Sequence, residues 1–527
     1  MGPLEPALLW RPVEQWADKK PDAEALVFED QRLTWREFRE QVDLTAKAFL
    51  ALDVQRGERI AMISMARPEF MTSFMAASKI GAIWLGLSPK FTLDELRYLI
   101  GHSRPVVLIT LAEYMGINLV ETGLTFFQEF PFLREVLVID KTTPEGVDYH
   151  SFVREARPEL DEALAQRTSE VQPGDEVLLM YTSGSTGKPK GVLQTHEAIV
   201  RNIAVEVKHF DWNEDTRALL HFPINHVAAD VELGYGAVFA GATLVMMDRF
   251  DPARSLEVVE HEGITVIGQV PAMYLMQFQT EQYRRMNWQN VRAFVYGGST
   301  PPQLLLDVLA PLAEKIGARL MTGYGSTELC GFVTYTTPED DLELLAKSAG
   351  KVAPPFEMKI VDDVRSELPA GEIGEIAVRG PSIMKGYLNN PEATAAVLDA
   401  EGWYYSSDLG YLNEQGYLFI SGRKSEMYKS GGENVFPREI EEVIEAHPAV
   451  LFAAVIGVPD PLYSEVGHAF VMVKPGKSVG AEAIIEHCKS HLANFKVPKR
   501  LELRPALPLL PNGKVNKVAL KNELGLV

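Results

Sequence analysis

Along the chain, short runs of apolar residues alternate with stretches in which apolar residues recur at helical spacing. Residues 59–64 (RIAMIS) form an apolar run typical of a buried strand, and residues 68–80 carry apolar side chains at helical spacing behind a proline. Gly81 ends this predicted helix, and residues 82–87 predict the next strand. A second strand–helix–strand unit is predicted at 243–247, 256–262 and 265–269. This alternation predicts an α/β fold with partly parallel sheets.

The pattern changes near residues 422–423. Before this point, residues 403–420 predict short strands with a turn at 414–416. After it, Gly431 and Gly432 precede a predicted helix at 437–446, in which Ile440, Val443, Ile444 and His447 share one face. Strands at 452–457 and 469–473 and a helix at 481–492 follow. We therefore expect a large N-terminal α/β domain at 1–422 and a small α+β domain at 423–527, a usual domain size.

Composition and charge narrow the class of protein. Hydrophobic residues make up 46% of the 527 residues and charged residues 23%, as in ordinary globular proteins. The formal net charge of −21 argues against a general nucleic-acid binder or a protein of anionic membrane surfaces. Cys330 and Cys488 lie far apart, which argues against a disulfide framework or a zinc site. With no signal-peptide pattern and no apolar run of about 18 residues, we expect a cytoplasmic protein without an integral membrane segment.

A loop rich in glycine and hydroxyl residues, 181–191 (YTSGSTGKPKG), follows the apolar run 177–180. Such residues let backbone N–H groups surround a phosphate chain, and two lysines add positive charge. A Walker A loop is excluded, because Thr182 stands near the place of its first glycine and Pro189 follows Lys188. A flexible linker is the alternative, although linkers rarely carry two lysines in this setting. The candidate phosphate-binding residues are Thr182, Ser183, Gly184, Ser185, Thr186, Gly187, Lys188 and Lys190.

This loop resembles the phosphate-binding signature of the adenylate-forming superfamily, which includes acyl-CoA synthetases, peptide-synthetase adenylation domains and luciferases. Three further segments resemble the motifs of the superfamily in the same order: 323–328 (GYGSTE), 405–410 (YSSDLG) with Gly422 and Arg423, and 511–515 (PNGKV). The resemblance runs from about Leu33 to nearly the end of the chain, and it is strongest to an acyl-CoA synthetase. It implies ATP, Mg²⁺ and coenzyme A as ligands, an acyl-AMP intermediate, and a mobile C-terminal domain.

The resemblance also implies roles for single residues. Glu328 would hold Mg²⁺, a hard cation that prefers carboxylate oxygen, with Thr182 as a second ligand. Asp408 would accept hydrogen bonds from the ribose hydroxyls, and Arg423 would reach the same ribose. Isolated residues of these types are commonly surface carboxylates or turn residues, so the motifs carry the inference. The remaining nucleotide-binding set comprises Gly298, Ser299, Thr300, Gly323, Tyr324, Gly325, Ser326 and Thr327, with Tyr324 against the adenine and Thr327 near the α-phosphate.

In the superfamily, different segments of the chain serve adenylation and thioester formation. Lys514 would bridge carboxylate and phosphate oxygens during adenylation, whereas a lysine in a polar loop is ordinarily a solvated charge. His226 would stand between the acyl site and the thiol tunnel, although a lone histidine is often a core residue. Ser430, Gly431, Gly432 and Glu433 would line the pantetheine tunnel after the small domain rotates. The hinge departs from the superfamily at Ser425, where aspartate or lysine is usual.

The sequence gives little information about which carboxylic acid is the substrate. The stretches that would line the acyl pocket lie after His226 and at 270–274, 296–300 and 329–333, and they are mainly apolar or small, which favours a hydrophobic aliphatic, alicyclic or aryl acid. The aspartate that binds the amine in amino-acid adenylation domains is not evident at 222–229, although Asp230 and Glu232 are nearby. Transfer to a carrier-protein thiol, or oxidation as in luciferases, stays an alternative. A non-catalytic nucleotide-binding protein is a third reading, and a homodimer is left open.

Overall fold

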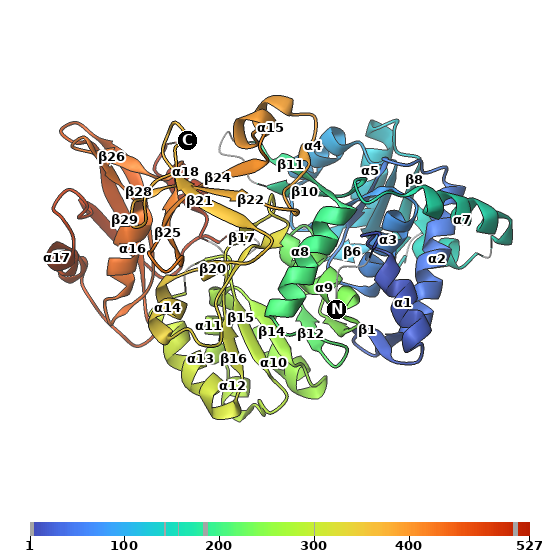
Figure 1. Ribbon diagram of the computed structural model, residues 1–527, viewed down its shortest axis with the longest axis horizontal. Coiled ribbons are helices and arrows are strands. Elements are labelled where there is room, and N and C mark those ends of the chain that lie inside the picture. Colours follow the sequence, from blue (N-terminus) through green and yellow to red (C-terminus); the bar gives the residue numbers. More distant parts are fainter. Residues whose placement is uncertain are drawn as a thin grey trace.

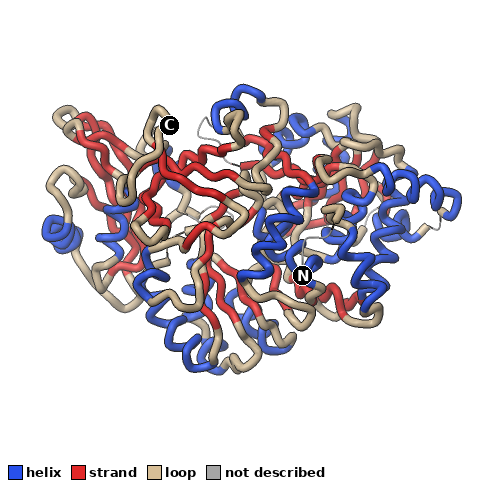
Figure 2. Tube along the Cα trace, viewed as in Figure 1, coloured by secondary structure: helices blue, strands red, loops and turns tan. Residues whose placement is uncertain are grey.

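The computed structural model describes residues 5–141, 144–155, 157–182, 188–299, 301–509 and 515–526. In Figure 1 most of the blue and cyan segments form one lobe, the green and yellow segments form a second lobe, and the red segments lie at the opposite end from the first. Figure 2 shows that helices cover the sheets of the two larger lobes, whereas the smaller part is rich in strands. The architecture is α/β, as predicted.

The first lobe is built on an eight-stranded sheet with the order β23-β11-β10-β4-β3-β5-β8-β9. Its strands are β3 (Arg59–Ile63), β4 (Ile83–Leu87), β5 (Val107–Leu111), β8 (Glu135–Ile139), β9 (Val147–Asp148), β10 (Glu176–Thr182), β11 (Lys190–Thr195) and β23 (Gly386–Tyr387). The central strands are parallel and buried, as unbroken apolar runs require. The predicted strands at 59–64 and 82–87 are confirmed, and so is the helix between them, α3 (Pro68–Lys79).

The second lobe is built on a seven-stranded sheet with the order β16-β15-β14-β12-β13-β1-β2. Its strands are β1 (Glu24–Phe28), β2 (Gln31–Thr34), β12 (Arg217–Leu220), β13 (Thr243–Met246), β14 (Val266–Gln269), β15 (Ala293–Tyr296) and β16 (Arg319–Met321). The predicted unit is confirmed in β13, α10 (Pro252–His261) and β14. The helix starts four residues before its predicted start at 256, because the Asp251 side chain caps it by accepting a hydrogen bond from Arg254 N at 2.8 Å.

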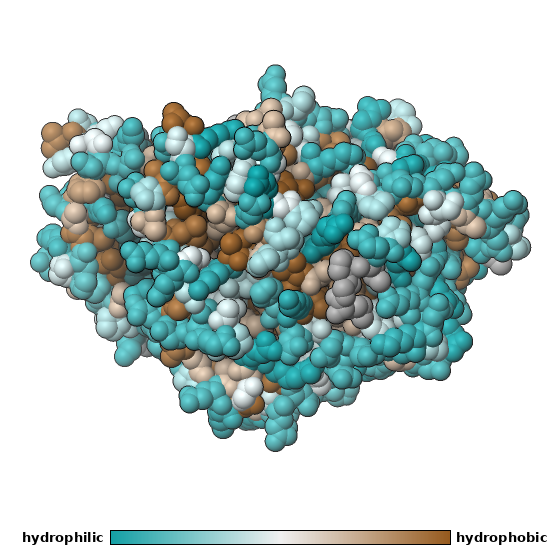
Figure 3. All heavy atoms as spheres, in the orientation of Figure 1, coloured by the Kyte–Doolittle hydropathy of each residue, from teal (hydrophilic) through white to brown (hydrophobic). Residues whose placement is uncertain are grey.

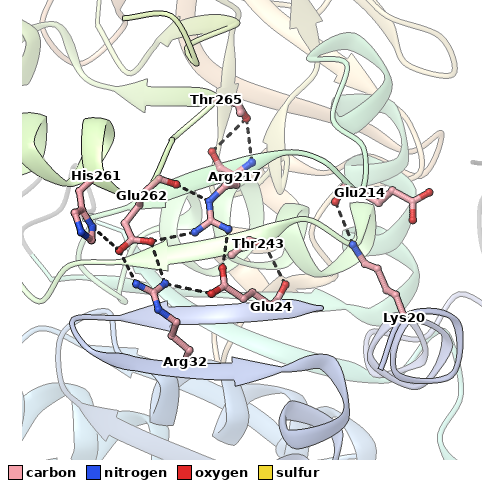
Figure 4. Close-up of polar contacts among 9 residues, drawn as sticks. All are labelled: Lys20, Glu24, Arg32, Glu214, Arg217, Thr243, His261, Glu262 and Thr265. Carbon is pink, nitrogen blue, oxygen red and sulfur yellow. Dashed lines mark hydrogen bonds and ion pairs between the residues drawn. The ribbon is translucent and has the colours of Figure 1, made fainter. Parts of the chain in front are cut away.

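A charged network joins strands at one end of this second sheet (Figure 4). Arg217 contacts Glu24 at 2.8 Å and Glu262 at 3.0 Å, and Arg32 contacts Glu262 at 2.8 Å. The hydrogen bond from Arg32 lowers the pKa of Glu262 to about 2. The network therefore ties the outer strand β2 to β12 and to the end of α10 as long as Glu262 is ionised.

A third, antiparallel sheet precedes the predicted small domain and contains β21 (Glu357–Val361), β22 (Gly374–Arg379), β24 (Trp403–Leu412) and β25 (Leu418–Arg423). The next sheet contains β26 (Tyr428–Ser430), β27 (Glu433–Val435), β28 (Val450–Asp460), β29 (Ser464–Val473) and β30 (Arg500–Arg504). The predicted helices are confirmed as α16 (Pro437–Glu445) and α17 (Ala481–His491). Strand β28 runs past Gly457, where the predicted strand ended. Gly457 is a close-packing position there, because a Cβ would lie 2.5 Å from Tyr428 Cβ.

The other helices cover these sheets. They are α1 (Arg11–Lys19), α2 (Trp35–Ala51), α4 (Leu93–Ser103), α5 (Leu119–Glu129), α6 (Tyr149–Arg154), α7 (Asp161–Glu170), α8 (His196–His209), α9 (Gly236–Ala240), α11 (Pro271–Phe278), α12 (Glu281–Arg285), α13 (Gln303–Ile316), α14 (Leu342–Lys347), α15 (Pro391–Val397) and α18 (Lys517–Glu523), with a π-helical segment at Ala228–Tyr235. Within the described ranges no helix is long and apolar enough to cross a bilayer. Figure 3 shows a mostly hydrophilic face, in keeping with the charged composition.

Candidate nucleotide and acyl site

The glycine-rich loop lies between two antiparallel strands of the first sheet. Thr182 is the last residue of β10 and pairs with Lys190, the first residue of β11. The two strand ends that flank the loop therefore lie opposite each other. Five of the predicted phosphate-binding residues, Ser183, Gly184, Ser185, Thr186 and Gly187, lie outside the described residues.

Helix α4 supports the base of this loop. Tyr98 Oη donates to Pro189 O at 3.1 Å, and the Lys188 ammonium lies 5.6 Å from the Tyr98 ring centre. His102 Nδ1 lies 2.8 Å from Tyr181 Oη, and burial raises the pKa of Tyr181, so the phenol stays protonated. The sequence analysis missed Tyr98 and His102, because nothing in the local pattern of a distant helix indicates contact with the loop.

The segment 323–328 forms a tight hairpin. Strands β17 (Gly325–Ser326) and β18 (Gly331–Phe332) pair with Gly325 opposite Phe332. A Cβ on Gly323 would lie 2.1 Å from Thr334 O, and one on Gly325 would lie 2.0 Å from Gly331 O, so both positions require glycine. These glycines thus let the turn that carries Thr327 and Glu328 approach neighbouring backbone.

Buried groups hold the backbone of this turn. Gln194 Nε2 on β11 donates to Thr327 O at 2.9 Å, and Met384 N donates to Glu328 O at 2.8 Å. Since β11 also begins at Lys190, one strand positions both the lysine of the phosphate loop and the acidic turn. The structure thus brings two of the predicted motifs to the same edge of the sheet.

Tyr387 in β23 connects the side chains of these motifs. Its Oη donates to Glu328 Oε1 at 3.1 Å, and the Lys190 ammonium lies 4.8 Å from its ring centre. Burial, and then the Glu328 carboxylate, raise the pKa of Tyr387, so it remains a donor at neutral pH. An oriented carboxylate suits Mg²⁺, which commonly takes one or two protein carboxylates together with substrate phosphates. Tyr387, like Tyr98 and His102, was not predicted from the sequence.

The predicted adenine and ribose residues form one hydrogen-bonded group. Tyr324 Oη donates to Asp408 Oδ2 at 2.8 Å, and Arg423 Nε lies 3.2 Å from Asp408 Oδ1. Asp408 faces Arg423 directly across the β24–β25 pair. Burial and then Asp408 raise the pKa of Tyr324, and Asp408 raises that of Arg423. Each carboxylate oxygen keeps a second lone pair, so Asp408 can still accept hydrogen bonds from a diol.

His226 opens the segment that leads into the π-helix Ala228–Tyr235. Its Nδ1 accepts a hydrogen bond from Ala228 N at 3.2 Å, so in the neutral ring Nε2 carries the proton. Gly297 lies against Phe332, because a Cβ on Gly297 would be 2.7 Å from Phe332 Cζ. Gly298 and Ser299 of the same loop are exposed, and the predicted Thr300 lies outside the described residues.

The predicted thioester loop is a hairpin tip. Ser430 ends β26 and Glu433 begins β27, and between them Gly431 and Gly432 both have positive φ, 61° and 92°, as a tight two-residue turn requires. Gly431 N donates to Tyr463 O at 2.8 Å, which anchors one side of the tip. Residues 431–434 are exposed, so the tip is free to meet another surface.

Lys514 lies outside the described residues, but both sides of its loop are placed. Leu509 and Val515 form an antiparallel bridge, which closes the base of the loop. Lys517, at the start of α18, contacts Glu426 at 2.6 Å and Glu441 at 2.8 Å. Glu426 follows Ser425, which is exposed in the turn after β25. An ion pair thus connects the base of the Lys514 loop to the predicted hinge.

Comparison with known proteins places the chain in a family. A model described as AMP-binding enzyme matches residues 13–388, and a model described as AMP-binding enzyme C-terminal domain matches residues 439–514. The chain belongs to the AMP-binding enzyme family. The matched ranges contain Glu328, the glycine-rich loop and Lys514, and Asp408 and Arg423 lie between them.

Curated members of the AMP-binding family match over nearly the whole chain. A 3-[(3aS,4S,7aS)-7a-methyl-1,5-dioxo-octahydro-1H-inden-4-yl]propanoyl:CoA ligase of Mycobacterium tuberculosis is 34% identical over 99% of this chain and 98% of that protein. A putative acyl-CoA synthetase of Bacillus subtilis, YngI, is 30% identical over 99% and 98%. An indoleacetate–CoA ligase of Aromatoleum aromaticum is 30% identical over 96% of both chains.

Solved structures of the AMP-binding family have the same fold. The amide bond synthetase McbA of Marinactinospora thermotolerans matches with a TM-score of 0.86 and 27% identity, over 98% of this chain and 99% of that chain. The o-succinylbenzoate CoA synthetase of Bacillus subtilis, in complex with the acyl-adenylate OSB-AMP, matches with a TM-score of 0.81 and 28% identity over 97% of both chains. The predicted large N-terminal part and small C-terminal part are confirmed in these relatives.

Proposed function

We propose that this chain is an ATP-dependent, AMP-forming acid–CoA ligase that uses ATP, Mg²⁺ and coenzyme A. The observation that carries the proposal is the match over 99% of the chain to proteins named as CoA ligases or acyl-CoA synthetases. It is supported by the contacts of Tyr387 with Glu328 and Lys190, and by the hydrogen-bonded group around Asp408. A scaffold without activity would have no need for a carboxylate oriented beside a phosphate loop.

The reaction has two displacement steps. A carboxylate oxygen of the acid attacks the α-phosphorus of ATP, pyrophosphate leaves, and an acyl-AMP mixed anhydride remains. The thiolate of coenzyme A then attacks the acyl carbon, and AMP leaves with the oxygen that the acid contributed. Bound Mg²⁺ supplies charge neutralisation for the phosphates, and Glu328 is the residue that would hold it. Most of the catalysis by the protein is therefore positioning and charge stabilisation.

Each mapped residue has one task in this scheme. Asp408 and Arg423 bind the ribose, and Tyr324 fixes Asp408 while its ring packs by the adenine. Lys188 and Lys190 neutralise phosphate charge, and Tyr387 orients Glu328. Lys514 stabilises the charge that develops on the oxygens in the first step. His226 separates the acyl space from the thiol path.

We infer that residues from 423 onward move as a unit between the two steps. Lys514 and the Gly431–Gly432 tip belong to this same part of the chain and serve different steps, so both cannot occupy the active site at once. The exposed Ser425 turn, which follows the last strand of the preceding sheet, is the natural place for the backbone rotation. This division at 422 and 423 is a prediction that the half-reaction measurements below address.

The acid we propose has an apolar body. Several relatives are named for acids with ring systems, including the bicyclic dioxo acid and indoleacetate. The acyl-lining stretches of this chain contain the buried apolar residues Val231, Leu233 and Tyr274. An alicyclic or aryl acid therefore fits both the relatives and the predicted walls.

A panel of acids tests the proposal. We expect AMP and pyrophosphate to be released in equal amounts only when acid, ATP and Mg²⁺ are all present, with steady turnover only when coenzyme A is added. A single burst without coenzyme A and a second product with hydroxylamine would mark trapped acyl-AMP. Turnover with an amine in place of coenzyme A would instead favour amide synthesis, as the name of McbA describes for that enzyme. Release of ADP, or no acid dependence, would reject the ligase.

A further inference from the structure

Two glutamates from different helical segments lie beside the hairpin of β17 and β18, close to Gly331. A Cβ placed on Gly331 of β18 would lie 3.3 Å from Glu206 Oε2 and 3.4 Å from Glu232 Oε1. Glu206 belongs to α8, and Glu232 belongs to the π-helical segment that begins just after His226. Gly331 has a φ of 122°, so this position disfavours any side chain that would fill the space between the two carboxyl groups.

This position coincides with the predicted acyl walls. Two of the stretches predicted to line the acyl pocket, the one after His226 and 329–333, contribute Glu232 and Gly331 respectively. Gly331 also pairs with Ser326 in the hairpin whose turn carries Glu328. The predicted acyl walls therefore include Glu232 and Gly331, next to the hairpin that carries the nucleotide motif. The sequence analysis missed Glu206, because a glutamate inside an amphipathic helix is ordinarily a solvated residue.

Glu206 has an unused hydrogen-bonding atom. It is only 3% exposed, and its Oε2 has no hydrogen-bond partner within the described residues. Glu232 is half-buried, so the pair lies where the interior meets accessible space. A buried carboxyl oxygen without a partner is costly, and native structures retain such atoms mostly where a ligand or water completes them.

The neighbours do not satisfy this atom. Tyr335 Oη, which is nearby, donates to Phe332 O at 2.9 Å, and its ring stacks on His209 at 4.3 Å. Burial and the two glutamates raise the pKa of Cys330, whose thiol is at best a weak donor. Burial, and then Glu232, hold the pKa of Glu206 well above its usual range. The oxygens of a carboxyl group keep lone pairs that can accept a hydrogen bond from a ligand.

We propose that Glu206 and Glu232 together bind a hydrogen-bond-donating group, an amino or hydroxyl group, at the far end of the carboxylic acid substrate. The substrate is then an apolar acid with a polar tip: its body contacts the apolar walls, its carboxylate faces the phosphate loop, and its N–H or O–H completes Glu206 Oε2. This assignment rests on the proposed ligase function and narrows its substrate class.

Matched acids and variants test this assignment. We compare 3-phenylpropanoic acids that carry methyl, hydroxyl or amino groups at the para or meta position, because methyl preserves shape but donates no hydrogen bond. Wild-type kcat/KM should favour the best donor acid over its methyl analogue by about tenfold or more, since sites built to bind a donor reject analogues that lack it. Glu206→Leu and Glu232→Leu should each bring this ratio close to one.

A control and a second readout keep the outcomes distinct. Glu197→Gln on the same helix removes an exposed partner of Arg201 and should leave the ratio at its wild-type value. Where Glu206→Leu does not fold, Glu206→Met replaces it, because methionine has a similar shape but no oxygen acceptor. If the two glutamates were purely structural, their variants would lose stability but would keep the wild-type kcat/KM ratio of donor acid to methyl acid. That result would overturn the proposal.

Failure of the ligase function is separable from failure of this inference. If wild-type enzyme releases AMP with methyl and donor acids at equal kcat/KM, the ligase stands and the inference fails. If no acid releases AMP, the ligase assignment fails. Binding without ATP, measured as the rise in melting temperature with each acid, then decides the inference. Stronger protection by donor acids than by methyl acids, lost in Glu206→Met, supports it, and equal protection refutes it.

Discussion

The contact between Tyr387 and Glu328 yields a sharp prediction. Tyr387→Phe removes the hydroxyl that donates to Glu328 Oε1 at 3.1 Å but keeps the ring on which Lys190 rests at 4.8 Å. A hydrogen bond to a charged group contributes about 1.5–3 kcal/mol, and each 1.4 kcal/mol corresponds to about a factor of ten. Glu328 is partly exposed, so water replaces part of the lost interaction. We therefore expect the adenylation rate to fall about 10- to 100-fold.

The assay is acid-dependent exchange of pyrophosphate into ATP at saturating Mg²⁺. Tyr417→Phe is the matched control, because Tyr417 also donates to a carboxylate, Asp340, and has Lys351 at 4.2 Å from its ring centre, but belongs to none of the site motifs. We expect the control to exchange at close to the wild-type rate. A wild-type rate in Tyr387→Phe, or an equal loss in both variants, would refute the positioning of Glu328 by Tyr387.

The remaining predictions concern the metal, the lysine, the hinge and acid stability. Glu328→Ala should abolish Mg²⁺-dependent turnover while circular dichroism shows a folded protein; undiminished turnover of that variant in excess EDTA would exclude it as the metal ligand. Lys514→Ala should slow adenylation by about 10²–10³-fold, yet it should still form thioester from supplied acyl-AMP; an equal loss in both half-reactions would contradict an adenylation-specific role. Ser425→Pro should lock one pose, because proline fixes φ near −65°, so single-turnover experiments should show one half-reaction far slower than the other; near wild-type rates for both would make Ser425 an ordinary linker residue. Glu262→Gln should lower the free energy of unfolding by about 1–3 kcal/mol at pH 7, since the pKa of Glu262 falls from 4.5 to about 2 on folding. Because a lowered pKa stabilises the fold above the unfolded value and loses this contribution as pH falls towards about 2, the difference from wild type in urea titrations should shrink below pH 4.5, and a constant difference would argue against the charge.

The elements of the fold were predictable where one strong local pattern decides them. Short apolar runs such as β3 and β4 favour buried parallel strands, and Pro68 marks the first turn of α3 correctly. The predicted boundaries were wrong where a contact with another part of the chain, or a side-chain cap, decides where an element begins or ends. Gly457 looks like a strand end but packs on Tyr428, and the cap at Asp251 extends α10 beyond its apolar face.

The candidate site divides in the same way. Residues in contiguous motifs, such as Tyr324, Glu328 and Asp408, were predicted because those motifs resemble the motifs of the superfamily, and their roles stay predictions. Residues that act from another element were not, because their partners are distant in the sequence. Tyr387 reaches Glu328 from a two-residue strand, and Glu206 reaches Gly331 from a helix whose local pattern is ordinary.

The path of one oxygen atom tests the central claim most directly. The acid is labelled with ¹⁸O in both carboxylate oxygens, and the products of one complete turnover with ATP, Mg²⁺ and coenzyme A are examined by mass spectrometry. If the acid attacks the α-phosphorus and AMP later leaves from the acyl carbon, then AMP carries one ¹⁸O and the thioester keeps the other. Label in inorganic phosphate, or AMP without label, would contradict the acyl-AMP mechanism that we propose for this protein.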